Sequence, residues 1–183
     1  MASDMGLTKF IFNRLLGWRI IGSIDPDKMK KAVIIVVPHT SWHDFYIGVF
    51  VRRLIDAEIN FVAKKELFKW PIGWYFRWMG GAPLDRSKNQ NKVDSIVTLF
   101  KSREVFRLAM APEGTRKKVT HWRSGYYFIA KLAEVPIIPV SFDYRIKRVT
   151  VGSPFYTTDD YDKDTEQLKK FYEGVVGKVP ENT

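Results

Sequence analysis

Two residues five positions apart, His39 and Asp44, carry side chains suited to acid–base chemistry. His39 follows the apolar, β-branched run of residues 32–38, so it should lie at a turn between a buried strand and a helix. Such a turn can fold the Asp44 carboxylate back onto the imidazole, where it accepts one ring N–H and stabilises the imidazolium. The other ring nitrogen is then free to take a proton from a hydroxyl group. The pattern indicates a general base, although a hydrogen-bonded histidine that caps a turn explains the same spacing.

The same segment raises two other kinds of chemistry. His39 and His43 are four residues apart, as in helical zinc motifs, but Pro38 and the preceding strand disfavour a helix at His39. Ser41 lies only two residues from His39, and the chain has no Gly-x-Ser-x-Gly elbow for a serine nucleophile. The chain has no cysteine, which excludes disulfides and a cysteine nucleophile. Direct attack by the hydroxyl that His39 deprotonates is the simpler mechanism.

Arginine follows two further predicted strands, each time beside a glycine-containing turn. Arg86 ends the run Gly-Gly-Ala-Pro-Leu-Asp-Arg at residues 80–86, and Arg116 ends Pro-Glu-Gly-Thr-Arg at residues 112–116. The planar donor fork of arginine suits the oxygens of a phosphate group. These turns therefore indicate phosphate binding, although an ordinary surface turn with solvated charges explains either one taken alone.

Strand-like and helix-like segments alternate along the chain. Strands are predicted at residues 32–38, 59–63, 105–110 and 137–142, and helices at residues 44–57, 65–79, 91–103 and 125–134, with an interruption or restart at Pro71. This alternation predicts an α/β fold, a single layered domain over residues 1–183 in which helices flank a mostly parallel mixed sheet. Ligands in such folds collect at the carboxyl ends of the strands. His39, Arg86 and Arg116 should therefore share one edge of the sheet.

The order of four sequence blocks resembles the glycerolphosphate and lysophosphatidate acyltransferase family. The blocks are His-x4-Asp at His39 and Asp44, Gly-x4-Asp-Arg at residues 80–86, Pro-Glu-Gly-Thr-Arg at residues 112–116, and Val-Pro-Ile-Ile-Pro at residues 135–139. The segment Ala-Lys-Lys-Glu-Leu at residues 63–67 is also similar to that family. The resemblance extends over residues 33–142 and implies the α/β fold of these acyltransferases.

The resemblance implies a role for each matching residue. His39 would be the general base on the acceptor hydroxyl, and Asp44 would orient it. The substrate-binding residues would be Lys64, Arg86, Glu113, Gly114, Thr115 and Arg116, with Arg86, Arg116 and Lys64 on the phosphate of the acceptor. The implied activity, part of phospholipid biosynthesis, moves a fatty acyl group from acyl-coenzyme A or acyl-carrier protein to the hydroxyl of a lysophosphatidate-like acceptor. It requires no metal and no other cofactor.

The sequence departs from the family pattern near the third block. Ala111 stands where an aromatic residue is usual, Lys117 stands where a small hydroxyl residue is common, and residues 121–127 are bulkier than usual. These differences bear on the acceptor and on the acyl-chain length. An amine or another lipid hydroxyl is therefore an alternative acceptor for the same fold.

The charge and the aromatic residues indicate the partners. With 30 Lys and Arg against 20 Asp and Glu, the net charge of +10 attracts an anionic membrane, coenzyme A, an acidic carrier protein or nucleic acid. A nucleic-acid-binding module is the less favoured alternative, because no nucleic-acid motif is recognised and no nucleic acid is expected as a partner.

Two segments indicate attachment to a membrane surface. Residues 1–18 predict an amphipathic helix, and no stretch reaches the roughly 20 apolar residues that cross a bilayer. Trp70, Trp74 and Trp78 recur every four residues among lysines, which is typical of a membrane interface, of a core helix or of the wall of an acyl-chain tunnel. We expect a cytoplasmic protein that is peripheral on the inner face of the membrane.

Overall fold

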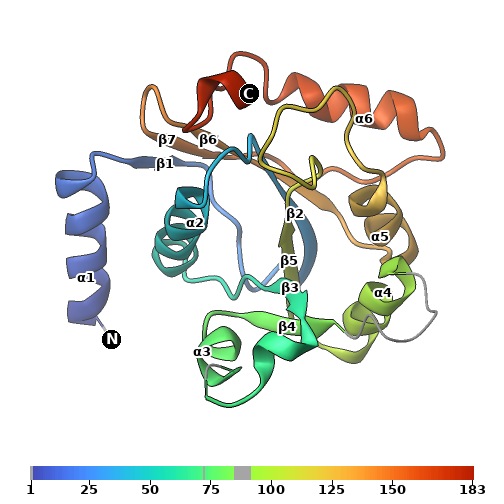
Figure 1. Ribbon diagram of the computed structural model, residues 1–183, viewed down its shortest axis with the longest axis horizontal. Coiled ribbons are helices and arrows are strands. Elements are labelled where there is room, and N and C mark those ends of the chain that lie inside the picture. The colour runs from blue at the N-terminus through green and yellow to red at the C-terminus, as the bar shows by residue number, and fades with distance from the viewer. Residues whose placement is uncertain (1, 72, 85–91) are drawn as a thin grey trace.

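A five-stranded sheet forms the centre of the molecule. The computed structural model describes residues 2–71, 73–84 and 92–183 (Figure 1). The strand order is β1 (Arg19–Ile21), β7 (Arg148–Val151), β6 (Ile137–Asp143), β2 (Lys31–Val37) and β5 (Phe106–Met110). All neighbouring strands are parallel except β6 and β7, which pair antiparallel. The predicted mostly parallel mixed sheet is confirmed.

Strand β2 lies between β5 and β6, as its apolar sequence requires. Ile35 is in register with Met110 of β5 and with Pro139 of β6. Because the three strands run parallel, the segments that follow β2 and β5 emerge at the same edge of the sheet. This register places the residues after Val37 beside the residues after Met110.

Helices cover both faces of the sheet, and the side chains of β2 alternate between the two cores. On one face, Val33 and Ile35 pack in a cluster with side chains of α4 (Lys92–Ser102), α5 (Gly125–Ala133) and α6 (Tyr161–Lys170). On the other face, Ala32 and Ile34 pack with side chains of α2 (His43–Leu54) and of η1 (Ile11–Leu15), which continues α1 (Ala2–Phe10). Large buried aromatics lie on both faces, with Tyr126 and Tyr127 on the first and Phe12 on the second.

A second, two-stranded sheet lies beside the first. It consists of β3 (Phe61–Lys64) and β4 (Gly81–Leu84), which pair in parallel, and a bridge between Asn60 and Leu108 joins it to the central sheet. Residues 59–63 were expected to form a strand, and the strand that forms is shifted and lies in this smaller sheet. The connection between β3 and β4 contains a short 3₁₀ turn (Lys65–Phe68) and α3 (Gly73–Trp78), so the helical segment expected at residues 65–79 is interrupted at Pro71, as predicted, and only its second part is α-helical.

Gly73, the first residue of α3, lies very close to the backbone of Phe68. A Cβ atom at Gly73 would lie 2.0 Å from the carbonyl oxygen of Phe68, so the chain folds back there only because glycine has no side chain. The described residues contain no helix long and apolar enough to cross a membrane.

Candidate active site

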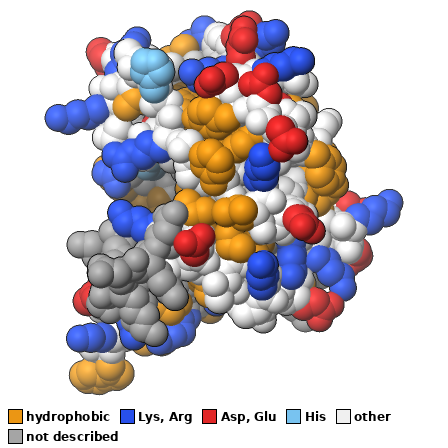
Figure 2. Space-filling view, turned by 90° about the vertical axis from the view of Figure 1, so that its right-hand side faces the viewer, with side chains coloured by type: hydrophobic (Ala, Val, Ile, Leu, Met, Phe, Trp, Pro, Cys, Tyr) orange, Lys and Arg blue, Asp and Glu red, His pale blue; other side chains and the backbone are white. Residues whose placement is uncertain are grey.

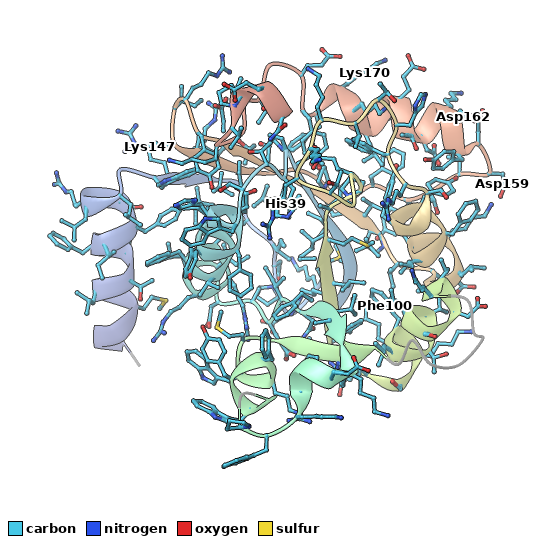
Figure 3. The ribbon with its side chains drawn as sticks, viewed as in Figure 1. His39, Phe100, Lys147, Asp159, Asp162 and Lys170 are labelled. Carbon is cyan, nitrogen blue, oxygen red and sulfur yellow. The ribbon has the colours of Figure 1, made fainter. Side chains whose placement is uncertain are left out.

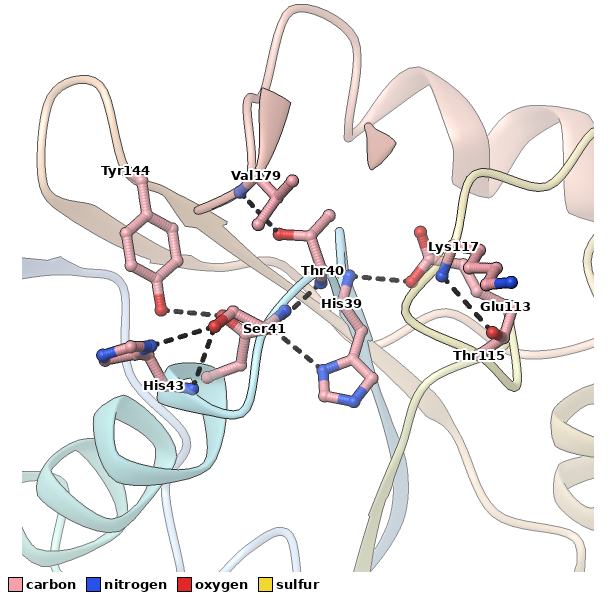
Figure 4. A network of polar contacts seen from close by, with 10 residues as sticks. His39, Thr40, Ser41, His43, Glu113, Thr115, Lys117, Tyr144 and Val179 are labelled. Atoms are coloured by element: carbon pink, nitrogen blue, oxygen red, sulfur yellow. Dashed lines mark hydrogen bonds and ion pairs between the residues drawn. The ribbon is translucent and has the colours of Figure 1, made fainter. Parts of the chain in front are cut away.

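The turn after β2 is organised around the carboxylate of Asp44. Asp44 Oδ2 lies 3.0 Å from His39 Nδ1 and accepts hydrogen bonds of 3.0 Å from the backbone N–H groups of Thr40 and Ser41 (Figure 4). The predicted contact between His39 and Asp44 therefore forms. Because α2 begins at His43, Asp44 also lies in the first turn of the helix, where the helix dipole favours a negative charge.

Asp44 is buried but ionised. Burial alone would raise its pKa, but the hydrogen bonds from His39 and from the N–H of Ser41, together with that of Tyr144, outweigh burial and lower the pKa below its ordinary value. An ionised carboxylate can only accept, so Nδ1 of His39 carries the proton in this contact. Nε2 of the neutral ring is then the nitrogen that can accept a proton from a substrate.

Tyr144 contributes to the same network from outside the motif. Its hydroxyl donates a 2.7 Å hydrogen bond to Asp44 Oδ1, across a separation of 100 residues. Burial, together with the neighbouring Asp44 carboxylate, raises the pKa of Tyr144 well above its ordinary value, so the hydroxyl stays a donor. No local sequence pattern indicates this residue, because only the pairing of β6 with β2 brings the segment after β6 to the turn.

Glu113 connects the loop after β5 to the turn after β2. Its Oε2 accepts a 2.7 Å hydrogen bond from the backbone N–H of His39, and the side chain is buried (Figure 4). Burial raises the pKa of Glu113, and the hydrogen bond from His39 opposes that rise only in part. The resemblance places Glu113 in the acceptor pocket, whereas the observed contact gives it a second task, which is to hold the backbone of His39.

The other residues of this loop are placed differently. Gly114 adopts a left-handed conformation with φ of +66°, and a Cβ atom there would lie 2.5 Å from Nε of Arg123. Thr115 Oγ1 accepts a 3.3 Å hydrogen bond from the N–H of Lys117, and Arg116 is exposed. Arg123 is thus a further cation at this loop, which the sequence reasoning did not single out.

An apolar cavity of about 290 Å³ opens beside His39 and Asp44. Its walls come from the inner side of α2, from β2, from the end of β5 and from the second sheet, with Phe45, Gly48, Ile34, Ala109 and Phe61 among the lining residues. A cavity of this kind can take an apolar ligand and hold it next to the dyad. Sequence reasoning did not find it, because its lining residues are ordinary core types.

Comparison with known proteins identifies the family. The sequence model of the family described as Acyltransferase matches residues 21–143, which is more than half of the chain. The chain belongs to the acyltransferase family. The resemblance carried by the four blocks is therefore confirmed at the level of the family.

Two relatives of this acyltransferase chain are informative. A 1-acyl-sn-glycerol-3-phosphate acyltransferase of Saccharomyces cerevisiae is 31% identical over 122 residues, which are 61% of this chain and only 38% of the yeast protein. The crystal structure of the 1-acyl-sn-glycerophosphate (LPA) acyltransferase PlsC from Thermotoga maritima superposes with a TM-score of 0.61 at 22% identity. That alignment covers 94% of this chain and 78% of the PlsC chain, and it supports the fold.

No direct contact with the dyad's turn is described for two of the residues that the family resemblance assigns to phosphate binding. Lys64 is the last residue of β3, in the second sheet of the acyltransferase chain, and Arg86 lies outside the described residues. The structure therefore brings together His39, Asp44 and Glu113 through direct contacts, with Gly114, Thr115 and Arg116 following in the loop that Glu113 begins.

The three tryptophans of α3 and its preceding turn are exposed. Trp70, Trp74 and Trp78 have 91%, 67% and 64% of their surface accessible, so the interpretation as a core helix is wrong. None of the three is among the residues that line the cavity beside His39. Of the three interpretations of this spacing, the membrane interface fits the exposure.

Proposed function

We propose that the chain transfers a fatty acyl group from a thioester to the hydroxyl of a lysophosphatidate-like acceptor. The observation that carries the proposal is the His39–Asp44 pair at an apolar cavity, with Nδ1 engaged by an ionised carboxylate. A hydroxyl-activating base beside a site for a hydrocarbon chain suits acyl transfer. The family membership and the yeast relative support the same chemistry.

In the proposed reaction, His39 first accepts a proton from the acceptor and later gives it to the leaving thiolate. Nε2 of His39 takes the proton of the acceptor hydroxyl as the oxygen attacks the thioester carbonyl. The C–S bond then breaks, and the thiolate leaves with the proton that His39 returns. Asp44 stays ionised and stabilises the imidazolium between these two steps. The reaction needs no metal and no redox cofactor.

The apolar cavity is the proposed site of the acyl chain, and Gly48 offers a way to test it. A Cβ atom at Gly48 meets no other side chain within 4 Å, so a larger residue there would project into open space in the cavity wall. Gly48→Phe should fill the cavity and shift the preference toward shorter acyl chains by about tenfold. Gly48→Ala is the matched control, which adds one methyl group, stabilises α2 by about 1 kcal/mol and should shift the preference far less. If both variants had the same preference for acyl-chain length, the cavity would not be the site that binds the acyl chain.

In this proposal, arginine side chains bind the phosphate of the acceptor. Arg116 is exposed in the loop that Glu113 ties to His39, and Lys117 and Arg123 add positive charge to the same loop. Guanidinium groups bind phosphate oxygens through paired hydrogen bonds. This placement, together with the family blocks, supports a phosphate-bearing acceptor, with Arg86 and Lys64 as further proposed contacts.

The decisive experiment measures thiol release from acyl-coenzyme A by the purified protein, with and without lysophosphatidate. We expect release that depends on the acceptor. The panel also includes an amine acceptor and a lipid hydroxyl without phosphate. Transfer to these but not to lysophosphatidate would overturn the assigned acceptor, and no transfer to any acceptor would overturn the acyltransferase activity.

We also propose that the protein binds the surface of an anionic membrane. Exposed apolar side chains on α1 and η1, which include Leu7 and Phe10, alternate with Lys9 and Arg14, and the exposed tryptophans lie near Lys69 and Arg77. Tryptophan with flanking cations favours the membrane interface. Sedimentation with vesicles should show binding that rises with the anionic lipid fraction, and binding that ignores lipid charge would contradict this.

A further inference from the structure

A second cavity, of about 670 Å³, lies on the other side of the catalytic turn. It is lined by residues from the segment just before β1, from α2 and the residue before it, from the turn between β6 and β7, and from the C-terminal segment. Figure 4 shows that Tyr144 and His43, which both line it, lie on the opposite side of Ser41 from the His39 ring. The apolar cavity and this cavity thus flank the same turn.

The chemistry of this second cavity is aromatic and cationic. Trp42 and Tyr46 both line it, and about half of each residue is accessible to solvent, with exposed fractions of 53% and 52%. Three cations, Arg145, Lys147 and Lys178, line it, and no Asp or Glu is found among its described lining residues. Aromatic rings stack on nucleobases, and lysine and arginine bind phosphates, so the cavity is suited to a phosphorylated nucleotide.

The cations are held in place but keep free donors. Lys147 Nζ donates a 3.1 Å hydrogen bond to the carbonyl of Leu16, and Lys178 Nζ lies 5.8 Å from the centre of the Tyr144 ring. Each ammonium group has three N–H donors, so both lysines can still donate to a phosphate. Arg145 is engaged by Asp143 at 3.2 Å and contributes less free charge.

The cavity is also within reach of the reacting centre. Trp42 and His43 line it, and the Cα atoms of His39 and His43 are at most about 15 Å apart, because four peptide units join them. A ligand bound there can therefore extend a flexible arm over the turn to His39, while its acyl chain enters the apolar cavity on the far side.

We propose that this cavity binds the adenosine 3′,5′-bisphosphate end of an acyl-coenzyme A donor. This inference rests on the proposed acyl transfer and adds the identity of the donor. Coenzyme A combines an adenine ring, several phosphate charges and a pantetheine arm that ends in the thioester. A concave, aromatic-lined site fits such a nucleotide better than it fits an acidic carrier protein, whose docking buries a broader surface.

The first measurement is a calorimetric titration of the full chain with adenosine 3′,5′-bisphosphate. We expect saturable binding that Lys178→Glu and Trp42→Leu each weaken about tenfold or more, whereas Trp42→Phe keeps most of the stacking. Lys163→Glu, in α6, is the matched charge reversal. Figure 3 shows Lys147, which lines the cavity, at the α1 end of the molecule, and Asp162, the neighbour of Lys163, at the opposite end. Figure 2 shows that positive and negative side chains are mixed on the face over α4 to α6.

The second measurement compares two donors, acyl-coenzyme A and acyl-pantetheine, which lacks the nucleotide. The parent protein should have the higher kcat/KM for acyl-coenzyme A, and Lys178→Glu should reduce that preference about tenfold, because it lowers kcat/KM for acyl-coenzyme A much more than kcat/KM for acyl-pantetheine. Adenosine 3′,5′-bisphosphate should compete with acyl-coenzyme A.

The outcomes separate this inference from the proposed function. Acyl transfer without any binding or inhibition by the bisphosphate, including transfer from acyl-carrier protein alone, overturns the nucleotide site and leaves acyl transfer intact. Binding that none of the cavity variants weakens places the nucleotide elsewhere and also overturns it. Binding that depends on Trp42 and Lys178, without acyl transfer to any acceptor, supports the site and refutes the enzymatic proposal.

Discussion

The turn after β2 and the loop after β5 follow neighbouring parallel strands, yet they are built differently. In the turn, Asp44 is 4% exposed, and its carboxylate contacts His39, two backbone N–H groups and Tyr144. In the loop, Arg116 is exposed, and the hydrogen bond of Thr115 is a local one to the N–H of Lys117. A buried network fixes one geometry, whereas exposed cations on a loop can adjust to a ligand. The turn therefore suits chemistry, and the loop suits substrate binding.

The largest expected effect comes from His39→Ala. Loss of the general base should lower kcat by about 10²–10⁴-fold. Folding should persist, because the ring is partly exposed and the backbone N–H that Glu113 holds remains in the variant. Thiol release measures the activity, and a urea titration measures the stability. His121→Ala is the control, since His121 is an exposed histidine whose Nδ1 contacts Thr120. A His39→Ala protein with near-normal turnover would refute the assigned base.

Asp44→Asn should have the next largest effect on turnover, with a loss of stability as well. The amide retains one oxygen but cannot accept all the hydrogen bonds that now converge on the carboxylate, so His39 loses its fixed tautomer. We expect kcat to fall about 10²-fold.

Tyr144→Phe removes the single hydrogen bond that Tyr144 donates to Asp44. It should cost about 1 kcal/mol of stability, with a smaller loss of kcat than Asp44→Asn. If Tyr144→Phe cost as much activity as Asp44→Asn, the turn would not be fixed by its local contacts.

The contrast between these contacts also explains what the sequence could predict. The contact of His39 with Asp44 spans five residues and depends on a strand-to-helix turn, so local patterns suffice to predict it. The contacts of Glu113 with His39 and of Tyr144 with Asp44 join residues 74 and 100 positions apart. They exist only because β5 and β6 flank β2 in a particular register, which the apolar pattern of each strand does not encode by itself.

The same limit applies to the elements of the fold. The α/β class and the helices α1, α2, α4 and α5 could be predicted from their apolar patterns, whereas β1, β7 and α6 had no such signal. β1 has three residues and β7 has four, too few for a periodic pattern. α6 is predominantly polar, and its buried residues include Asp164, whose carboxylate accepts hydrogen bonds from Thr158 and Tyr127. Burial of that kind depends on tertiary partners.

Arg116→Ala tests the loop side of the comparison. If Arg116 binds the phosphate of the acceptor, its loss should raise the acceptor KM by about tenfold or more while kcat and the free energy of unfolding change little. Arg116→Lys keeps the charge but loses the paired donors, so we expect an intermediate KM. Initial rates at varied acceptor concentration measure both constants. If kcat fell while KM stayed unchanged, Arg116 would act in the chemical step, like the residues of the turn. The proposed difference between the loop and the turn would then be wrong.

Glu113→Gln should have the smallest effect and tests the point where the two regions meet. Burial raises the pKa of Glu113 above 4.5, its ordinary value, in the folded protein. Between these two pKa values the folded chain holds a proton that the unfolded chain has lost, so the contribution of Glu113 to stability is full below pH 4.5 and is lost as the pH rises through the folded pKa. Glutamine does not titrate, and its side-chain oxygen can still accept the N–H of His39. In urea titrations, the stability of Glu113→Gln relative to the parent should therefore increase from pH 4.5 to pH 8. A constant difference over this range would mean that Glu113 is as well solvated as the exposed residues of its loop, and that the loop and the turn are not coupled through a buried carboxyl group.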